Sequence, residues 1–292
     1  FNHQPQTSNE TQNYVSTVRA AWQTLIGRQL PKAEDVQRAK GWKEVQAGYI
    51  EFGDTLTLTT HAEQLPIISV YPKSVEWNQK VVLWIDGNGK TGMFPNGTAH
   101  PELLRLINAG YAVVAADLFG QGEFTTNGES LTENITVKNP RQFAGYTYCY
   151  NETVFARRVH DILTVAAWVG GDEHSPKAVH AIGVNGGGPL LAAARTIAGS
   201  AINAAAIDTA NFRFTNLSDW KHADFLPGAV KYGDLPTVLA LSAPNKLWIG
   251  NEDQLPPIVA QIYNNSGQPK AVTSSSNSLN LTTEAVDYIL QQ

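Results

Sequence analysis

The chain has 292 residues, enough for one large domain or two modest ones, and its apolar fraction of 42% is ordinary for a protein that buries a core. Its formal charge of −5 excludes a strong electrostatic attraction to nucleic acid or to an anionic membrane. The single cysteine, Cys149, excludes an intrachain disulfide and an all-cysteine metal site.

Features that bear on localisation point in two directions. No apolar run is long enough to span a bilayer, and the N-terminus lacks the basic-then-apolar pattern of a signal peptide. N-x-Ser/Thr sequons are numerous, which suits a secreted surface, although a chain rich in Asn, Ser and Thr also produces them by chance. They begin at Asn9, Asn96, Asn134, Asn151, Asn216, Asn264 and Asn280. Localisation stays open, and a periplasmic or extracellular location is the favoured expectation.

The first elements change from helical to strand periodicity. Residues 1–27 predict a polar loop and then a helix with Val18 and Trp22 on its apolar face. A connector then leads to Gly48. Residues 49–52 and 56–59 predict two strands joined by a tight turn at Gly53-Asp54, and residues 67–71 predict a third strand.

Apolar strands then alternate with helical segments. The expected strands are 81–85, 111–116, 178–182, 202–207, 247–249 and 270–273, and the expected helices are 100–108, 152–169, 189–197 and one from about Thr282, which can cap it. This alternation predicts an α/β fold with a mostly parallel sheet, an antiparallel edge hairpin and helices on both faces. In helix 152–169, Arg157 is placed to pair with Asp161 on the exposed face.

Two glycine-rich loops follow predicted strands. Residues 87–92 match G-x-G-x-x-G, with Asp117 at the next strand end as a possible partner for a ribose hydroxyl. A dinucleotide site would need a helix to start at this loop, but residues 93–97 delay the helix. The second loop, residues 119–123, predicts a sharp turn and nothing more specific.

A third loop carries the most information. Strand 178–182 leads into Gly183-Val184-Asn185-Gly186-Gly187, and Pro189 suits the first turn of the next helix. This strand, turn and helix follow the G-x-S-x-G nucleophile elbow, with asparagine in the serine position.

Together with the segments 81–92, 111–122, 155–169, 226–234 and 243–248, this loop resembles the acetyl xylan esterase-like group of α/β-hydrolases. In particular, the chain is similar to the second half of large bacterial proteins that carry two such domains in tandem. The resemblance implies that residues 1–45 are an N-terminal helix and linker, or the tail of a preceding hydrolase domain. Residues 46–292 would then form the hydrolase domain, with Gly87, Asn88 and Gly186 at its oxyanion-type loop.

The catalytic triad of this family is incomplete in the chain. Asn185 replaces the nucleophile, and its amide cannot form an acyl-enzyme as a hydroxyl can. Glu252 and Asp253 are candidates for the acid, although solvated loop carboxylates that cap the next helix are the favoured interpretation. The histidine position falls in residues 274–277, which contain none, and His3 would belong to the preceding domain.

Other residues could substitute for the missing groups. His160 and Asp161 lie on the longest helix, where a structural role is the favoured interpretation. Asp208, His222 and Asp224 could share the mouth above Asn185. No H-E-x-x-H spacing appears, so neither a metal nor a cofactor is expected. A sugar-binding surface could be lined by aromatic residues, although most tryptophans near strands are core: Trp84, Trp220, Trp248, Tyr146 and Tyr148.

Three functional hypotheses follow. The first is a degenerate, secreted bacterial pseudoenzyme that serves as a structural partner or as a carbohydrate-facing module. The second is an active carbohydrate esterase whose missing groups come from a preceding domain or from another subunit of a homo-oligomer. The third is a dinucleotide-binding module.

Overall fold

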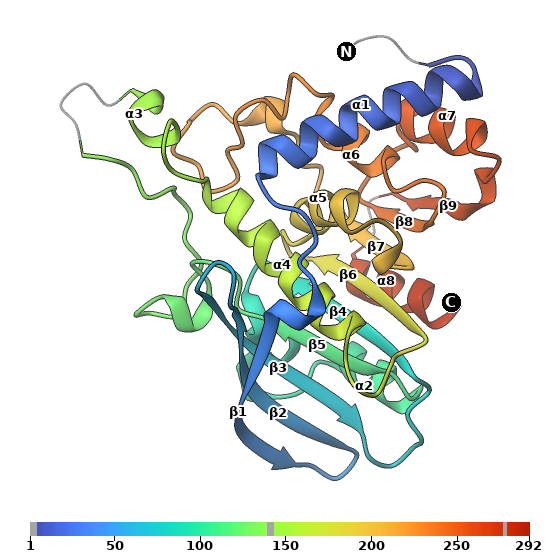
Figure 1. Cartoon of the computed structure of the whole chain (residues 1–292). Helices are drawn as coiled ribbons and strands as arrows, with labels where there is room; N and C mark the ends of the chain where they lie inside the picture. Colours follow the sequence, from blue (N-terminus) through green and yellow to red (C-terminus); the bar gives the residue numbers. More distant parts are fainter. Residues whose placement is uncertain (1–4, 139–142, 277–278) are drawn as a thin grey trace.

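A computed structural model describes residues 5–138, 143–276 and 279–292. Within these residues, nine strands form one sheet in the order β1-β2-β3-β5-β4-β6-β7-β8-β9 (Figure 1). The strands are β1 Val36–Val45, β2 Tyr49–Leu58, β3 Glu63–Pro72, β4 Lys80–Asp86, β5 Ala112–Ala116, β6 Ala178–Val184, β7 Ala204–Asp208, β8 Lys246–Gly250 and β9 Val272–Ser275. Strands β4 to β9 are parallel, and β1, β2 and β3 are antiparallel to their neighbours. The predicted mixed sheet with an antiparallel edge is confirmed.

Helices cover both faces of this sheet. One apolar core joins the sheet to α1, α4, α5, α6 and α7, and a second joins its other face to α2 and α8. The helices are α1 Ser8–Ile26, α2 Pro101–Asn108, α3 Ala144–Tyr148, α4 Val154–Gly170, α5 Gly188–Ala198, α6 Asp234–Ala240, α7 Pro257–Asn265 and α8 Leu281–Leu290. None of the described helices combines the length and hydropathy needed to cross a bilayer.

The antiparallel edge differs from the sequence prediction. Gly53 and Asp54 lie inside the continuous strand β2, and the chain reverses before Tyr49 and after Leu58 instead. Gly53 serves close packing here, because a Cβ atom at this position would lie 2.2 Å from the Trp42 ring. The predicted connector also contains strand β1, in which only the first residue, Val36, is buried. An edge strand exposed in this way carries no apolar alternation to reveal it.

The two ends of the chain add a helix each. Thr7 is the N-cap of helix α1, and its hydroxyl accepts a hydrogen bond from the Glu10 N–H. Val18 and Trp22 on this helix are fully buried, as predicted. Helix α8 starts one residue earlier than expected, with Asn280 at its N-cap, so Thr282 lies inside the helix and the predicted cap is wrong. The proposed division at residue 45 stays a prediction.

Candidate functional site

The turn from β6 into α5 presents an exposed asparagine. Asn185 follows the last residue of β6 and has a φ of 51°, and Gly186 after it has a φ of 92°. Asparagine and glycine tolerate this left-handed region better than other residues. The chain therefore reverses within a few residues, and the Asn185 side chain stands at the carboxyl edge of the parallel strands, where ligands bind in open α/β sheets.

Close backbone contacts explain the glycines around this turn. A Cβ atom on Gly187 would lie 2.3 Å from the Ile85 carbonyl oxygen, and one on Gly188 would lie 1.8 Å from the Asp208 carbonyl oxygen. Across the turn, Gly87 packs against the Asn185 carbonyl, to which a Cβ atom would come within 2.0 Å. The turn is thus wedged between the ends of β4 and β7, and Gly87 and Asn185 are brought together.

Asp86, the last residue of β4, is the hydrogen-bonding centre of the site. The residue is 2% exposed, and its Oδ2 accepts hydrogen bonds from Asn185 Nδ2 at 2.9 Å and from Trp84 Nε1 at 3.3 Å. Its Oδ1 accepts from the Asn88 backbone N–H at 2.9 Å and from Asn88 Nδ2 at 3.1 Å. The Asn88 N–H is therefore already engaged, and the Asn185 amide is held by a carboxylate. Nothing in the sequence pattern singled out Asp86 beyond its place at a strand end.

The acid position contains an ion pair. Glu252, just after β8, is buried, and its two carboxylate oxygens accept hydrogen bonds from Arg213 at 2.9 and 2.6 Å. The favoured expectation of a solvated carboxylate is wrong for Glu252, because Arg213 compensates its charge inside the protein. Asp253 is exposed.

The histidines lie elsewhere. The residues after β9 are Ser276 and then Asn277, and both Asn277 and His3 fall outside the described residues. His222 forms an isolated β-bridge with Glu133 and lies 3.8 Å from Asp224. Among the described residues, the Asn185 side chain hydrogen-bonds to Asp86 and not to a histidine.

The loop with the G-x-G-x-x-G pattern has a structural explanation. It continues as a 3-10 turn over Gly89–Met93, and α2 begins only at Pro101, so the next α-helix does not start at this loop. The Asp117 carboxylate accepts hydrogen bonds from the backbone N–H groups of Lys90 and Glu123, which ties this loop to the next one. Asp117 thus holds the two loops together instead of facing a ribose.

The proposed sugar-binding aromatic residues divide into two groups. Trp84 and Trp248 are buried in the core, 1% and 6% exposed, so they cannot line a surface for sugars. Tyr148 packs edge-on against Trp220 at 6.0 Å and donates a hydrogen bond to its carbonyl oxygen, which makes these two a local packing unit. Tyr146 is 40% exposed on α3.

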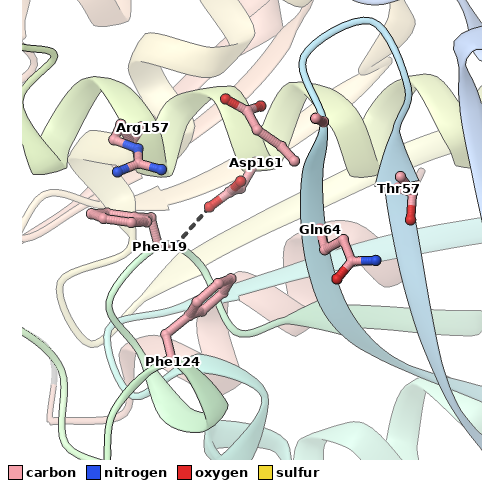
Figure 2. A pocket seen from close by; sticks show the side chains of 8 residues that line it. Thr57, Gln64, Phe119, Phe124, Arg157 and Asp161 are labelled. Atoms are coloured by element: carbon pink, nitrogen blue, oxygen red, sulfur yellow. Dashed lines mark hydrogen bonds between the residues drawn. The ribbon is translucent and has the colours of Figure 1, made fainter.

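A pocket of about 410 Å³ with polar and aromatic lining residues opens beside α4, and no sequence pattern indicated it. Figure 2 shows Arg157, Phe119 and Asp161 on one side of it and Thr57 and Gln64, from β2 and β3, on the other. Arg157 lies over the Phe119 ring at 3.5 Å from its centroid instead of forming the predicted exposed pair with Asp161.

Asp161 itself is buried and accepts a hydrogen bond from the Phe119 N–H at 2.6 Å. Burial raises the pKa of its carboxyl group to about 8, so the group is mostly protonated at neutral pH.

Comparisons with known proteins place the fold. No protein-family model and no curated protein sequence matches the chain. A structure from Bacteroides fragilis, described as a candidate acetyl xylan esterase, is 17% identical and covers 94% of this chain and 78% of its own, with a TM-score of 0.71. A glucuronoyl esterase from Solibacter usitatus is 11% identical over 94% of this chain and 90% of its own, with a TM-score of 0.63.

Acetyl xylan esterase 1 from Thermoanaerobacterium is a further structural neighbour. It is 12% identical over 99% of this chain and 95% of its own, with a TM-score of 0.54. These likenesses and the strand order show that the chain has the α/β-hydrolase fold of carbohydrate esterases.

Proposed function

We propose that the chain is a catalytically degenerate α/β-hydrolase domain that binds carbohydrate and does not cleave esters at the turn containing Asn185. The observation that carries this proposal is the bond from Asn185 Nδ2 to Asp86 Oδ2. An ester hydrolase of this fold needs a hydroxyl or thiol at this point to form the acyl-enzyme. A side-chain amide held by a carboxylate offers no such group.

The surroundings of Asn185 support the same conclusion. Glu252 is engaged by Arg213, so this carboxylate is not available to orient a histidine. The Asn88 N–H, a candidate oxyanion donor, points at Asp86 instead. In a serine hydrolase, loss of the nucleophile alone lowers the rate by about six orders of magnitude.

Carbohydrate is the favoured ligand class for two reasons. The structural neighbours are named as esterases of acetyl xylan and of glucuronoyl groups. The pocket in Figure 2 combines the hydrogen-bonding side chains of Thr57, Gln64 and Arg157 with the aromatic rings of Phe119 and Phe124. Small-molecule sites commonly consist of apolar walls with a few placed polar groups.

The test has two arms. We expect the chain and its Asn185→Ala and Asn185→Ser variants to hydrolyse p-nitrophenyl acetate no faster than buffer does. A rate abolished by Asn185→Ala would overturn the degenerate assignment and favour the active-esterase alternative.

In the binding arm, xylo-oligosaccharides are titrated into the chain in a calorimeter. We expect them to bind, and we expect the Phe124→Ala substitution to weaken this binding. The control, Phe143→Ala, removes an exposed ring from the segment before α3. Absence of binding, or equal binding by both variants, would refute the carbohydrate assignment.

A further inference from the structure

Three potential metal ligands from three segments meet beside the end of α1. Glu63 starts β3, Glu152 lies just before α4, and His160 lies in the second turn of α4. One donor atom from each lies within 4.8 Å of the others, and His160 Nδ1 is 3.8 Å from Glu152 Oε2. The imidazole is 1% exposed, whereas the Glu152 side chain is 48% exposed. The group is therefore anchored on its buried side and open to solvent on the other.

The hydrogen bonding of His160 determines which nitrogen faces the two carboxylates. Nε2 lies 2.6 Å from the Ile26 carbonyl oxygen. Because a carbonyl only accepts, Nε2 carries the hydrogen, and the neutral ring has its lone pair on Nδ1. Nδ1 is buried and has no hydrogen-bond partner in the described part of the chain. A histidine whose other nitrogen donates to a backbone carbonyl is the arrangement found in metal ligands.

Charge and geometry both suit a divalent cation. Both oxygens of Glu63 accept from Arg28, at 2.7 and 3.0 Å, which fixes the carboxylate as an outer-shell partner does for a metal ligand. With Arg28 counted, the two glutamates leave one uncompensated negative charge. Because the three donor atoms are at most 4.8 Å apart, an ion placed between them can lie within about 2.8 Å of all three. The distance from zinc to a nitrogen or oxygen ligand is about 2.0–2.2 Å. The half-exposed Glu152 side chain can rotate inward and shorten its distance to the ion.

We propose that Glu63, Glu152 and His160 bind a Zn²⁺ ion. The imidazole nitrogen selects a first-row metal over Mg²⁺ or Ca²⁺, which prefer oxygen ligands. The ion would join β3 to the start of α4, and through the bond from His160 to Ile26 it would also hold the end of α1. Its role is structural, because it ties together β3, the start of α4 and the end of α1, which lie far apart in the sequence.

The experiment titrates the full chain, first dialysed against EDTA, with ZnCl₂ and separately with MgCl₂. We expect calorimetry to give one Zn²⁺ per chain and the melting temperature to rise with Zn²⁺ but not with Mg²⁺. The test variant is Glu152→Gln, which changes a half-exposed side chain and leaves the core intact. It should weaken Zn²⁺ binding at least about tenfold and abolish the visible absorption bands of bound Co²⁺.

Two controls make the result specific. Glu173→Gln removes an exposed glutamate elsewhere, and His174→Asn removes an exposed histidine that lies 2.8 Å from Asp172 and could bind zinc adventitiously. Both should bind Zn²⁺ as the unaltered chain does. Absence of binding, binding unaffected by Glu152→Gln, or binding lost in His174→Asn would each overturn the proposal.

Discussion

His180 makes the stability of the fold depend on pH. It lies on β6, is 4% exposed, and neither ring nitrogen has a hydrogen-bond partner in the described part of the chain. Burial, together with the positive charges of Lys80, Lys246 and Arg195, lowers the pKa of His180 from 6.5 to about 4. Between about pH 4 and pH 6.5, the imidazole is therefore neutral in the folded state but protonated in the unfolded chain.

The sign and size of the effect follow from this difference. Because the folded pKa is depressed, the stabilisation is fully present above pH 6.5 and is lost as the pH falls toward 4. With pKa values of about 4 folded and 6.5 unfolded, the loss is about 2 kcal/mol at pH 5 and at most about 3 kcal/mol below pH 4.

The test replaces the ring by one that cannot titrate. His180→Phe keeps an aromatic ring opposite Tyr111, whose centroid is 6.3 Å away. Urea denaturation gives the free energy of unfolding at pH 7.5 and at pH 5. We expect its decrease between these two pH values to be about 2 kcal/mol smaller in this variant than in the unaltered chain. The control is His61→Phe, in the exposed turn between β2 and β3, which should keep the full pH dependence. Equal pH dependence in His180→Phe and the unaltered chain would refute the reasoning.

Two further substitutions test the packing around the site by urea denaturation at pH 7. Gly188→Ala should cost at least about 3 kcal/mol, since its Cβ would meet the Asp208 carbonyl oxygen at 1.8 Å, whereas Gly170→Ala, with open space around it, should change stability by less than about 1 kcal/mol. Similar values for both would contradict the close approach at Gly188. Arg213→Ala should cost about 2 kcal/mol because it leaves the buried Glu252 without a partner, and an unchanged unfolding midpoint would show that Glu252 is compensated otherwise.

The central sheet could be predicted because its strands are buried on both faces and therefore appear as continuous apolar runs, such as the one in β4. Strand β1 could not, since nine of its ten residues are exposed and it forms through backbone pairing with β2. The misplaced turn at Gly53 has a related cause. In the sequence, a glycine that makes room for Trp42 on the neighbouring strand β1 looks like a glycine that reverses the chain.

The candidate site was predictable only where local chemistry determines it. The glycines and the position of Asn185 follow from the strand, turn and helix pattern. The pairing of Glu252 with Arg213, which lies 39 residues earlier in the chain, depends on how the loops after β7 and β8 pack. The same holds for Glu63, Glu152 and His160, whose spacing in the sequence matches no metal-binding motif.

The sharp turn at Asn185 has reasons to exist that do not involve catalysis. Gly187 and Gly188 lie against the backbones of β4 and β7, so the sheet can pack closely around α5 only if the chain bends here. A residue at φ 51° is strained unless it is glycine or a residue such as asparagine, and the Asn185 amide also gains a bond to Asp86. A serine would lose both advantages. The shape of the turn therefore follows from the fold, whereas the side chain at residue 185 and its partners determine the chemistry.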